Sequence, residues 1–263
     1  IIFFKAIGVI FMSHHIVESR DVHFFYPDGT KALSGISFRI VHGESVALIG
    51  ENGAGKSTLL MHLNGYLTPS EGELIIGDYP ITKKTLLAVR RTAGFVFQDP
   101  DDQLFMPTVF DDVAFGPLYM NLPQEKIKQR VIDALKQVGA IHLIDRPPHK
   151  LSGGEKRIVT IASILSMTPD ILIMDEPTSN LDPRARRKII SILKTFLHTK
   201  IIATHDLDMA LDVCGRTLII HNGKIVADDS TNILLRDGEL LNKYGLDKPL
   251  GLQKCPVCSR TEL

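Results

Sequence analysis

The sequence lacks several features that would place a chain of this size outside the ordinary globular class. It has no excess charge of one sign, because 30 basic residues balance 30 acidic ones, and it has no long basic patch, so nucleic-acid binding is not expected. Repeats of long period and low-complexity linkers are also missing. Hydrophobic residues make up 44% and charged residues 23%, which argues against disorder. At about 150 residues per domain, 263 residues allow one large domain or one domain with a substantial subdomain.

Cysteine is scarce. The three cysteines, Cys214, Cys255 and Cys258, are too few to build a disulfide framework, and free thiols are typical of a reducing compartment, so a cytosolic location is expected. Cys255 and Cys258 form one C-x-x-C in the tail CPVCSRTEL, which is half of a zinc site. We interpret the tail as disordered. A zinc ion shared across a dimer is the alternative, and the sequence leaves it open.

Long hydrophobic runs are absent as well. Residues 1–11, IIFFKAIGVIF, are apolar but include Lys5 and fall short of the roughly 20 residues that a spanning helix needs. No basic start followed by a small-residue cleavage site precedes the polar MSHHIVESRD, which disfavours a signal peptide. Met12 is a more ordinary beginning, so we interpret residues 1–11 as an added or start-site extension within an N-terminal extension of residues 1–15.

Hydrophobic periodicity predicts an α/β fold. Alternating apolar and polar residues over 16–40, with YPDG between them, predict an antiparallel hairpin. SVALIG predicts a short strand followed by a glycine-rich loop and a helix, and GFVFQ predicts a buried strand ending at Gln98. DILIMD and KIIAT are apolar throughout and flank the helix DPRARRKIISILKTFL, which predicts a mainly parallel core sheet covered on both faces. TLIIHNGKIVAD predicts a hairpin that turns at Asn222 and Gly223.

A helical subdomain is predicted over about residues 106–165. VFDDVAFGPLYM and PQEKIKQRVIDALKQVG both have helical spacing, and the second is introduced by proline and ended by glycine. LSGGEKRIVTIASILSM is expected to be helical from about Gly153. The whole is therefore a mainly parallel sheet with an antiparallel β subdomain and a helical subdomain.

The stretch GENGAGKST has the spacing of a phosphate-binding loop between a strand and a helix. Glycines let backbone N–H groups point at phosphate oxygens, and the helix N-terminus adds positive potential. Lys56 would reach the β- and γ-phosphates, and the Ser57 hydroxyl would ligate Mg²⁺. A flexible strand-to-helix turn is the weaker alternative. The residues expected to bind the nucleotide, ATP or a related triphosphate, are Gly50, Glu51, Asn52, Gly53, Ala54, Gly55, Lys56, Ser57 and Thr58.

Two carboxylates follow the apolar run ILIM, at the edge where ligands bind in open parallel sheets. Asp175 suits Mg²⁺, directly or through water. Glu176 would point elsewhere and could orient or deprotonate an attacking water. By itself such a pair is more often a solvated loop, but a phosphate loop in the same sheet favours the catalytic interpretation.

LSGGE, residues 151–155, decides among the phosphate-loop families. Together with the loop at Gly50, Gln98, Asp175–Glu176 and His205 in the same order, it makes the chain resemble the nucleotide-binding subunits of ATP-binding cassette (ABC) transporters over about residues 16–235. The interval from Gln98 to Leu151 has room for a helical subdomain but not for the coiled coil of chromosome-maintenance ATPases. The single cassette also argues against the twin-cassette translation factors. The resemblance implies a P-loop NTPase of ABC ATPase type, with residues 236–263 as a C-terminal extension.

The resemblance gives the distant signature a role. Ser152, Gly153 and Gly154 form another small-residue helix start that can bind phosphate but brings no lysine. In the family this segment covers the nucleotide held by the opposite subunit, so the site is complete only in a dimer. A homodimer would be isologous, and a heterodimer is equally compatible with the sequence. An ordinary capped helix start is the alternative for this segment in isolation.

Further roles are implied by position in the family. Tyr26 would stack on adenine, although Phe24 and Phe25 are its neighbours. Gln98 would reach Mg²⁺ or the attacking water, and His205 would contact the γ-phosphate. Residues 180–182 would form the cross-subunit loop.

Three positions depart from the family pattern. Glu155 stands where glutamine is commoner, Ile158 where many relatives have arginine although Arg157 adjoins it, and Asn180 where glycine or alanine is usual. None removes a catalytic group. Each is expected to alter the rate or the dimer affinity.

A narrower resemblance concerns FQDPDDQLF and TVFDDVAFGPLYMNLP, which are similar to segments in ATPases of the energy-coupling-factor (ECF) importers, especially those for cobalt and nickel. There the segment after the glutamine lies beside the groove that receives the transmembrane partner. We therefore interpret Asp101 and Asp102 as part of a coupling surface whose alteration spares hydrolysis. Solvated loop acids, or metal ligands including Asp99, are the alternatives.

The sequence thus predicts a MgATP-hydrolysing subunit that drives import of cobalt or nickel from the cytoplasmic face of the cell membrane. Its expected partners are a second ATPase subunit, a transmembrane coupling subunit and a substrate-binding membrane subunit. The alternatives left open are an ECF vitamin importer and a soluble ABC-type regulatory or assembly ATPase. A nonenzymatic nucleotide-binding module is weaker, because Glu176 and His205 are both present.

Overall fold

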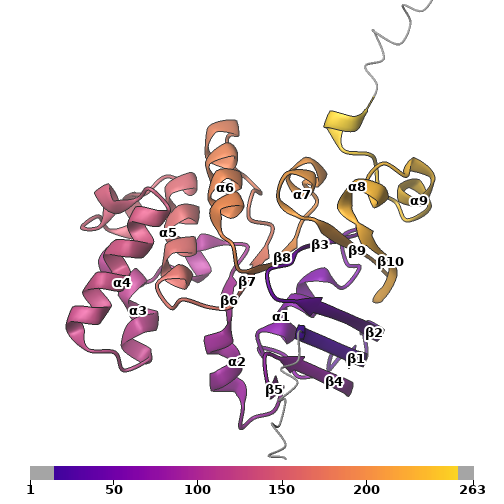
Figure 1. Ribbon diagram of the computed structural model, residues 1–263, viewed down its shortest axis with the longest axis horizontal. Coiled ribbons are helices and arrows are strands. Elements are labelled where there is room, and N and C mark those ends of the chain that lie inside the picture. The colour runs from indigo at the N-terminus through magenta and orange to yellow at the C-terminus, as the bar shows by residue number, and fades with distance from the viewer. Residues whose placement is uncertain (1–14, 254–263) are drawn as a thin grey trace, which may run out of the picture.

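The computed structural model describes residues 15–253, which form two β-sheets with helices packed around them (Figure 1). The predictions for residues 1–11 and for the pair Cys255 and Cys258 lie outside this range. Within it, no helix combines the length and apolar character needed to span a membrane.

The smaller sheet is antiparallel and follows the predicted hairpin. Its strand order is β2-β1-β4-β5, and every neighbouring pair is antiparallel. Apolar side chains from one face of this sheet pack with helix α1 (Lys56–Leu63), where Leu59, Leu60 and Leu63 are fully buried. The strands are β1 (His15–Phe25), β2 (Lys31–Val41), β4 (Glu71–Ile76) and β5 (Tyr79–Pro80).

The larger sheet has the strand order β10-β9-β3-β8-β7-β6 and is parallel except for β10. Its residues alternate between two cores: Ala47 packs toward the helices on one face, and Val46 packs toward α1 and the small sheet on the other. This explains the continuous apolar runs. The strands are β3 (Ser45–Ile49), β6 (Ala93–Val96), β7 (Ile171–Asp175), β8 (Thr199–Ala203), β9 (Arg216–His221) and β10 (Lys224–Ser230).

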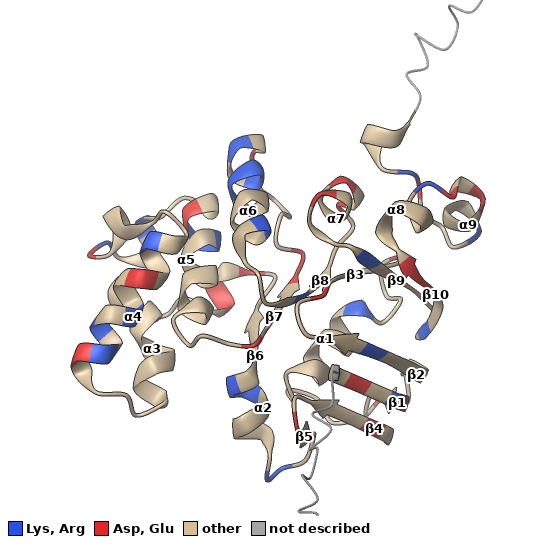
Figure 2. Cartoon of the chain, viewed as in Figure 1, with Lys and Arg blue, Asp and Glu red and all other residues tan. Residues whose placement is uncertain are grey.

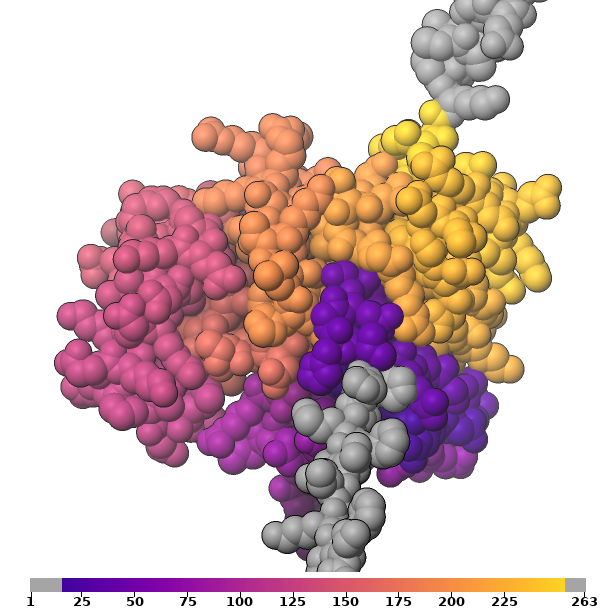
Figure 3. Space-filling view, in the orientation of Figure 1, coloured from indigo at the N-terminus to yellow at the C-terminus, as the bar shows by residue number. Residues whose placement is uncertain are grey.

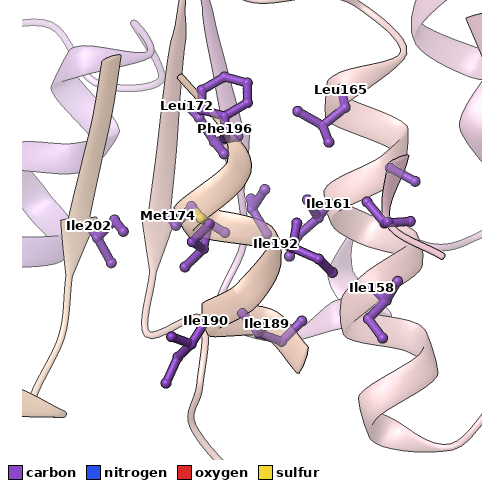
Figure 4. Close-up of a cluster of buried hydrophobic side chains, with 14 of the residues drawn as sticks. Ile158, Ile161, Leu165, Leu172, Met174, Ile189, Ile190, Ile192, Phe196 and Ile202 are labelled. Atoms are coloured by element: carbon purple, nitrogen blue, oxygen red, sulfur yellow. The ribbon is translucent and has the colours of Figure 1, made fainter. Parts of the chain in front are cut away.

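Helices cover the sheet and extend beyond it. Helices α3, α4 and α5 pack together at one end of the molecule (Figure 1). Figure 4 shows how Ile158 and Ile161 of α5 meet Ile189 and Ile192 of α6 and Met174 of β7. The helices are α2 (Leu86–Thr92), α3 (Val109–Tyr119), α4 (Gln124–Gln137), α5 (Gly153–Leu165), α6 (Pro183–Thr195), α7 (Leu207–Val213), α8 (Thr231–Leu234) and α9 (Gly238–Lys243). The predicted fold class is confirmed.

Two predicted elements differ in extent. The helical spacing of TKKTLLAVRR predicts a helix from Thr82, but α2 begins at Leu86, because the Thr85 hydroxyl donates to the Thr82 carbonyl and holds this stretch in a turn. Strand β6 ends at Val96, so the prediction that it ends at Gln98 is wrong. The apolar Phe97 continues the sequence pattern, but its N–H donates to the Gln103 side chain instead of to a strand.

The C-terminal residues in the described range pack onto the domain. Leu241 of α9 is fully buried. The Asp208 carboxylate, on α7, accepts hydrogen bonds from the N–H groups of Leu250 (3.0 Å) and Gly251 (2.9 Å). In the space-filling view the yellow C-terminal residues accordingly lie against the orange surface (Figure 3).

Candidate functional site

The carboxyl ends of strands β3, β7 and β8 surround a cavity of about 670 Å³. Parallel pairing puts these ends at one edge of the sheet, where open α/β sheets bind ligands. The cavity also has a wall that the sequence analysis missed: Thr30, Lys31 and Ala32 from the β1–β2 hairpin, which no motif marks. The predicted site residues that line it are Tyr26, Asn52, Gly53, Gly55, Lys56, Ser57, Thr58, Gln98, Asp175, Glu176 and His205.

The phosphate loop is shaped by its glycines. Gly53 and Gly55 have φ angles of +78° and +109°, which favour glycine, and a Cβ on Gly55 would lie 2.7 Å from the Ala32 carbonyl oxygen. Lys56 Nζ donates to the carbonyl oxygens of Gly50 (2.7 Å) and Glu51 (3.0 Å). The ammonium is therefore held over the loop by groups that phosphate oxygens can replace.

The charges at the cavity floor influence one another. Burial lowers the pKa of Lys56, and the carboxylates of Glu176 and Asp175 oppose that effect. Burial raises the pKa of Asp175, against a hydrogen bond from Ser57 that lowers it. Ser57, Gln98 and Asp175 give this part of the cavity a set of oxygen donors, the type that Mg²⁺ prefers. The donor set fits a magnesium ion carried by a nucleotide.

Glu176 and His205 form a contact at the cavity edge. The Nδ1 atom of His205 lies 2.7 Å from Oε2 of Glu176, and the His205 backbone N–H donates to the same oxygen at 3.2 Å. Glu176 has a φ angle of +47°, which is unusual for a residue with a side chain. Its N–H donates to the Ala203 carbonyl at 2.9 Å, which anchors the carboxylate to strand β8. Because His205 is 70% exposed and Glu176 only 11%, the imidazole is the part of the pair that is free to meet a ligand.

Tyr26 reaches the cavity from the end of β1. Its hydroxyl lies 3.0 Å from Thr58 Oγ1, and its ring makes an edge contact with Phe24 at 5.0 Å between centroids. Phe24 is buried, whereas Tyr26 lines the cavity. Of the three neighbouring aromatic residues Phe24, Phe25 and Tyr26, Tyr26 is the one that lines the cavity.

The signature residues do not meet the phosphate loop. Ser152 and Gly154 do not line the phosphate cavity, and Gly153 lines a neighbouring cleft of about 590 Å³ that also includes Gln98. Ser152 caps α5 by accepting a hydrogen bond from the Glu155 N–H at 3.4 Å. Oε2 of Glu155 in turn accepts from the Ser152 N–H and hydroxyl, each at 2.8 Å. Glutamate at position 155 therefore keeps a capping box.

The other two departures have structural reasons. Asn180 has a φ angle of +58°, a conformation that asparagine tolerates better than most residues. Asp182, after it, caps α6 by accepting from the N–H groups of Arg184 (2.8 Å) and Ala185 (3.0 Å). Ile158 of α5 is buried against apolar side chains of α6, where burying an unpaired arginine charge would be costly (Figure 4).

The acids after Gln98 have separate contacts. Asp99 Oδ1 accepts from the Asp101 N–H at 2.9 Å, and Asp101 pairs with Lys156 Nζ at 2.5 Å. Asp102 is exposed. Across residues 15–253, no group of three or more His, Cys, Asp or Glu side chains is arranged to hold a metal ion.

Beside His205, an ion pair joins two helices. Arg186 of α6 donates to both carboxylate oxygens of Asp206 at 2.6 and 2.7 Å. Lys194 and Asp212 form a second pair farther along at 2.9 Å. Figure 2 shows the same complementarity, with basic residues along α6 and acidic residues on α7.

Comparisons with known proteins agree with this geometry. The family model described as ABC transporter matches residues 33–179. GSU1281 of Geobacter sulfurreducens, whose name places it among ABC transporter ATP-binding proteins, is 61% identical over 95% of this chain and 100% of its own length. The energy-coupling factor transporter ATP-binding protein EcfA of Methanocaldococcus jannaschii is 47% identical over 89% of this chain and 86% of its own.

Among solved structures, cbiO1 of Clostridium perfringens superimposes with a TM-score of 0.79 at 40% identity. The match covers 88% of this chain and 94% of that one. That structure is described as part of the ABC transporter complex cbiONQ.

Proposed function

The chain belongs to the ABC transporter family as an ATP-hydrolysing subunit, and from that premise we propose that it powers an importer of the energy-coupling-factor type that takes up cobalt or nickel. The similarity to EcfA supports this type, because EcfA carries the energy-coupling-factor name. The similarity to cbiO1, which is part of an ABC transporter complex, supports a role in a transporter. The transition-metal cargo is proposed from the resemblance of FQDPDDQLF and TVFDDVAFGPLYMNLP to segments of the cobalt and nickel ATPases of this type. The cargo itself is selected by membrane subunits outside this chain.

The proposed chemistry is in-line attack of water on the γ-phosphate of bound MgATP. Glu176 orients or deprotonates the water, and His205, hydrogen-bonded to that carboxylate, contacts the γ-phosphate. Lys56 exchanges its backbone carbonyl partners for phosphate oxygens. Ser57, Asp175 and Gln98 would hold the Mg²⁺ of MgATP, which would neutralise charge on the phosphates. The adenine stacks on Tyr26.

A dimer is required to complete this site. The helix start at Ser152–Gly154 does not line the phosphate cavity of its own chain, yet it presents small residues and helix N–H groups suited to phosphate. We infer that it covers the nucleotide of a second ATPase subunit. A homodimer suffices chemically, because one chain carries both halves of the site.

An exposed apolar segment is the observation that carries the importer proposal. Phe105 and Phe115 are 63% and 45% exposed and stack edge-to-face with centroids 5.1 Å apart. Leu118 and Tyr119 on the same helix are 50% and 66% exposed. Large apolar side chains gathered on one short exposed segment mark a partner surface more often than free solvent contact. We extend the coupling surface expected at Asp101 and Asp102 to include the segment Phe105–Tyr119.

The coupling surface lies at the far end of the segment that starts at Gln98. Gln98, at the start of that segment, lines the phosphate cavity, and Phe105 is exposed farther along it. A movement of this segment on ATP binding would therefore reach a membrane partner bound at Phe105. We therefore propose that the chain is a peripheral subunit at the cytoplasmic face of the membrane.

Co-purification tests the proposal. A tagged chain expressed in its own cell type with mild detergent extraction should bring down small multi-spanning membrane proteins, identifiable by mass spectrometry. Recovery only from the soluble fraction, without membrane protein, would overturn the importer function. Cells that express this chain together with the co-purified membrane proteins are then tested for uptake of labelled Co²⁺ or Ni²⁺. Uptake of a vitamin instead would show that the cargo is a vitamin and not a metal ion.

A further inference from the structure

A buried arginine joins the signature helix to the main chain that carries Gln98. Arg157, on α5, is 3% exposed. Its guanidinium donates one hydrogen bond to the Phe97 carbonyl at 2.7 Å and another to the Gln98 carbonyl at 2.5 Å. One rigid fork therefore holds two consecutive carbonyls, a geometry that arginine supplies and lysine does not.

These hydrogen bonds take the place of those that Phe97 and Gln98 would make if β6 continued through them. Because β6 ends at Val96, Phe97 and Gln98 have no strand partner for their polar groups, which need partners when buried. The Phe97 N–H donates to Gln103 Oε1 at 3.2 Å. Gln103 Nε2 in turn donates to the Thr160 carbonyl (3.1 Å) and to Ser163 Oγ (2.9 Å), both on α5. The main chain at Gln98 is thus anchored to α5 from both sides.

The third link is weaker. Asp101 pairs with Lys156 of α5 at 2.5 Å, but the Asp101 side chain is 66% exposed. Exposed ion pairs contribute about 0–1 kcal/mol and are screened by salt. The main chain at Gln98 is therefore held to α5 mainly by Arg157 and Gln103.

We propose that Arg157 is a positioning residue for ATP hydrolysis, holding the Gln98 main chain so that the Gln98 side chain reaches the phosphate cavity and moves together with the signature helix. The inference rests on the proposed role of Gln98. It gives the signature helix two functions: its N-terminus faces the partner's nucleotide, and its first turns set Gln98 in the chain's own cavity. Engagement of one site thereby reaches the other.

Kinetics of two variants test the proposal. Arg157→Met removes both bonds, and Arg157→Lys keeps the charge and one bond. Because the phosphate loop is untouched, the KM for ATP should stay within about twofold while kcat falls on the order of 10- to 100-fold for Met, as expected when a catalytic group is displaced by about 1 Å. Lys should recover part of the loss. An unchanged kcat in Arg157→Met would overturn the proposal.

Arg130 provides a matched control. Its guanidinium also donates to two consecutive carbonyls, those of Ser166 (3.4 Å) and Met167 (3.3 Å), but at the opposite end of α5. Arg130→Met should lower the thermal midpoint without the selective loss of kcat. Equal kcat losses in Arg130→Met and Arg157→Met would mean that Arg157 only stabilises the subdomain.

A double-mutant cycle separates this inference from the function on which it rests. In the Gln98→Ala background, Arg157→Met should cause no further loss of kcat, whereas a purely structural arginine would cost the same factor in both backgrounds. If Gln98→Ala hydrolyses ATP normally, the proposed role of Gln98 fails and the inference with it. If Gln98→Ala is impaired and Arg157→Met is normal, only the positioning role fails. Should Arg157→Met not fold, Gln103→Met replaces it, because it frees the Phe97 N–H from α5 and should give the same selective loss of kcat.

Discussion

The Nδ1 atom of His205 lies 2.7 Å from Oε2 of Glu176, across the ends of two adjacent parallel strands. The backbone N–H of His205 reaches the same oxygen, so the carboxylate is oriented by two donors of one residue. The second carboxylate oxygen is left to meet a water molecule. The proposed base, Glu176, and the residue that orients it are thus already in contact in the chain itself.

Replacing Glu176 by glutamine should stop turnover without preventing binding. The amide keeps the size and can hydrogen-bond His205, but it cannot take a proton, so hydrolysis should fall by about 10²–10⁴-fold. ATP affinity should be retained, and the ATP-bound dimer should accumulate, because release depends on hydrolysis. Steady-state ATPase assays and size-exclusion chromatography with ATP measure both effects. The exposed Glu239→Gln on α9 is the control, and near-normal turnover in Glu176→Gln would remove Glu176 from the mechanism.

Replacing His205 by alanine should reduce kcat on the order of 100-fold, because the γ-phosphate loses a donor and Glu176 loses its orienting partner. The effect should be on hydrolysis more than on ATP binding, which Lys56 and the loop provide. His198, exposed at the other end of strand β8, offers the matched change His198→Ala. ATPase rates and nucleotide affinities are measured for both variants. If His205→Ala hydrolyses ATP as fast as His198→Ala, His205 has no catalytic role.

Local patterns foretold much of the site. The phosphate loop and the acids after β7 were predictable because glycine spacing, strand hydrophobicity and helix starts are encoded within a few residues. Thr30, Lys31 and Ala32 were not, because the pairing of β2 with β1 brings them to the cavity and no motif records a register. Pairwise geometry across the fold is the information that the sequence pattern does not show.

The end of β6 illustrates the same limit. Phe97 is apolar, so periodicity extends the strand to Gln98, but Arg157 and Gln103 take up the backbone groups that a strand would use. Arg157 stood in the sequence only as a neighbour of Ile158. A charge in an otherwise apolar helix signals that some partner is needed. Which partner it is depends on a contact between distant parts of the chain.

Glu155 at the signature should weaken ATP-driven dimerisation. Hydrogen bonds from the Ser152 backbone and hydroxyl lower the pKa of Glu155, so it is charged at neutral pH and would face the partner's anionic triphosphate. Glu155→Gln keeps the capping box and removes the charge. In the Glu176→Gln background, half-maximal dimerisation should then need up to about fivefold less ATP at low salt, which corresponds to about 1 kcal/mol for an exposed charge.

Light scattering against ATP concentration measures this shift, and added salt should diminish it. Glu125→Gln changes an acid in the first turn of α4, in the same subdomain, and serves as the control. If Glu155→Gln leaves the ATP requirement unchanged at low salt, the signature does not face the partner's phosphates.

Asp206 should contribute stability that disappears in acid. Burial raises its pKa, but hydrogen bonds from Arg186 and from the Met209 N–H outweigh this and bring the pKa below the ordinary 3.8. With a lowered folded pKa, the contribution is complete above 3.8 and is lost as pH falls through the folded value. Asp206→Asn should therefore lower the free energy of unfolding by about 1.5–3 kcal/mol at neutral pH, and the difference from wild type should shrink in acid.

Urea unfolding at a series of pH values measures this difference. Asp212→Asn breaks the ion pair between Asp212, which is 51% exposed, and Lys194, which is 49% exposed. This change should lower the free energy of unfolding by only about 0–1 kcal/mol. If the difference in free energy of unfolding between Asp206→Asn and wild type stays constant into the acid range, the charge of Asp206 contributes nothing to its hydrogen bonds.

Changing the coupling surface should separate transport from hydrolysis. Phe115→Ser removes an exposed ring that stacks on Phe105 and lies away from the residues that line the phosphate cavity. Basal ATPase of the isolated chain should stay close to wild type, while recovery of membrane subunits in co-purification drops at least severalfold, because central aromatic anchors dominate interface affinity. Leu197 is 83% exposed in the loop before β8, and Leu197→Ser removes comparable apolar surface elsewhere. If Phe115→Ser and Leu197→Ser retain the membrane subunits equally well, the partner binds another face, and the route from Gln98 to the membrane must run through a different part of the helical subdomain.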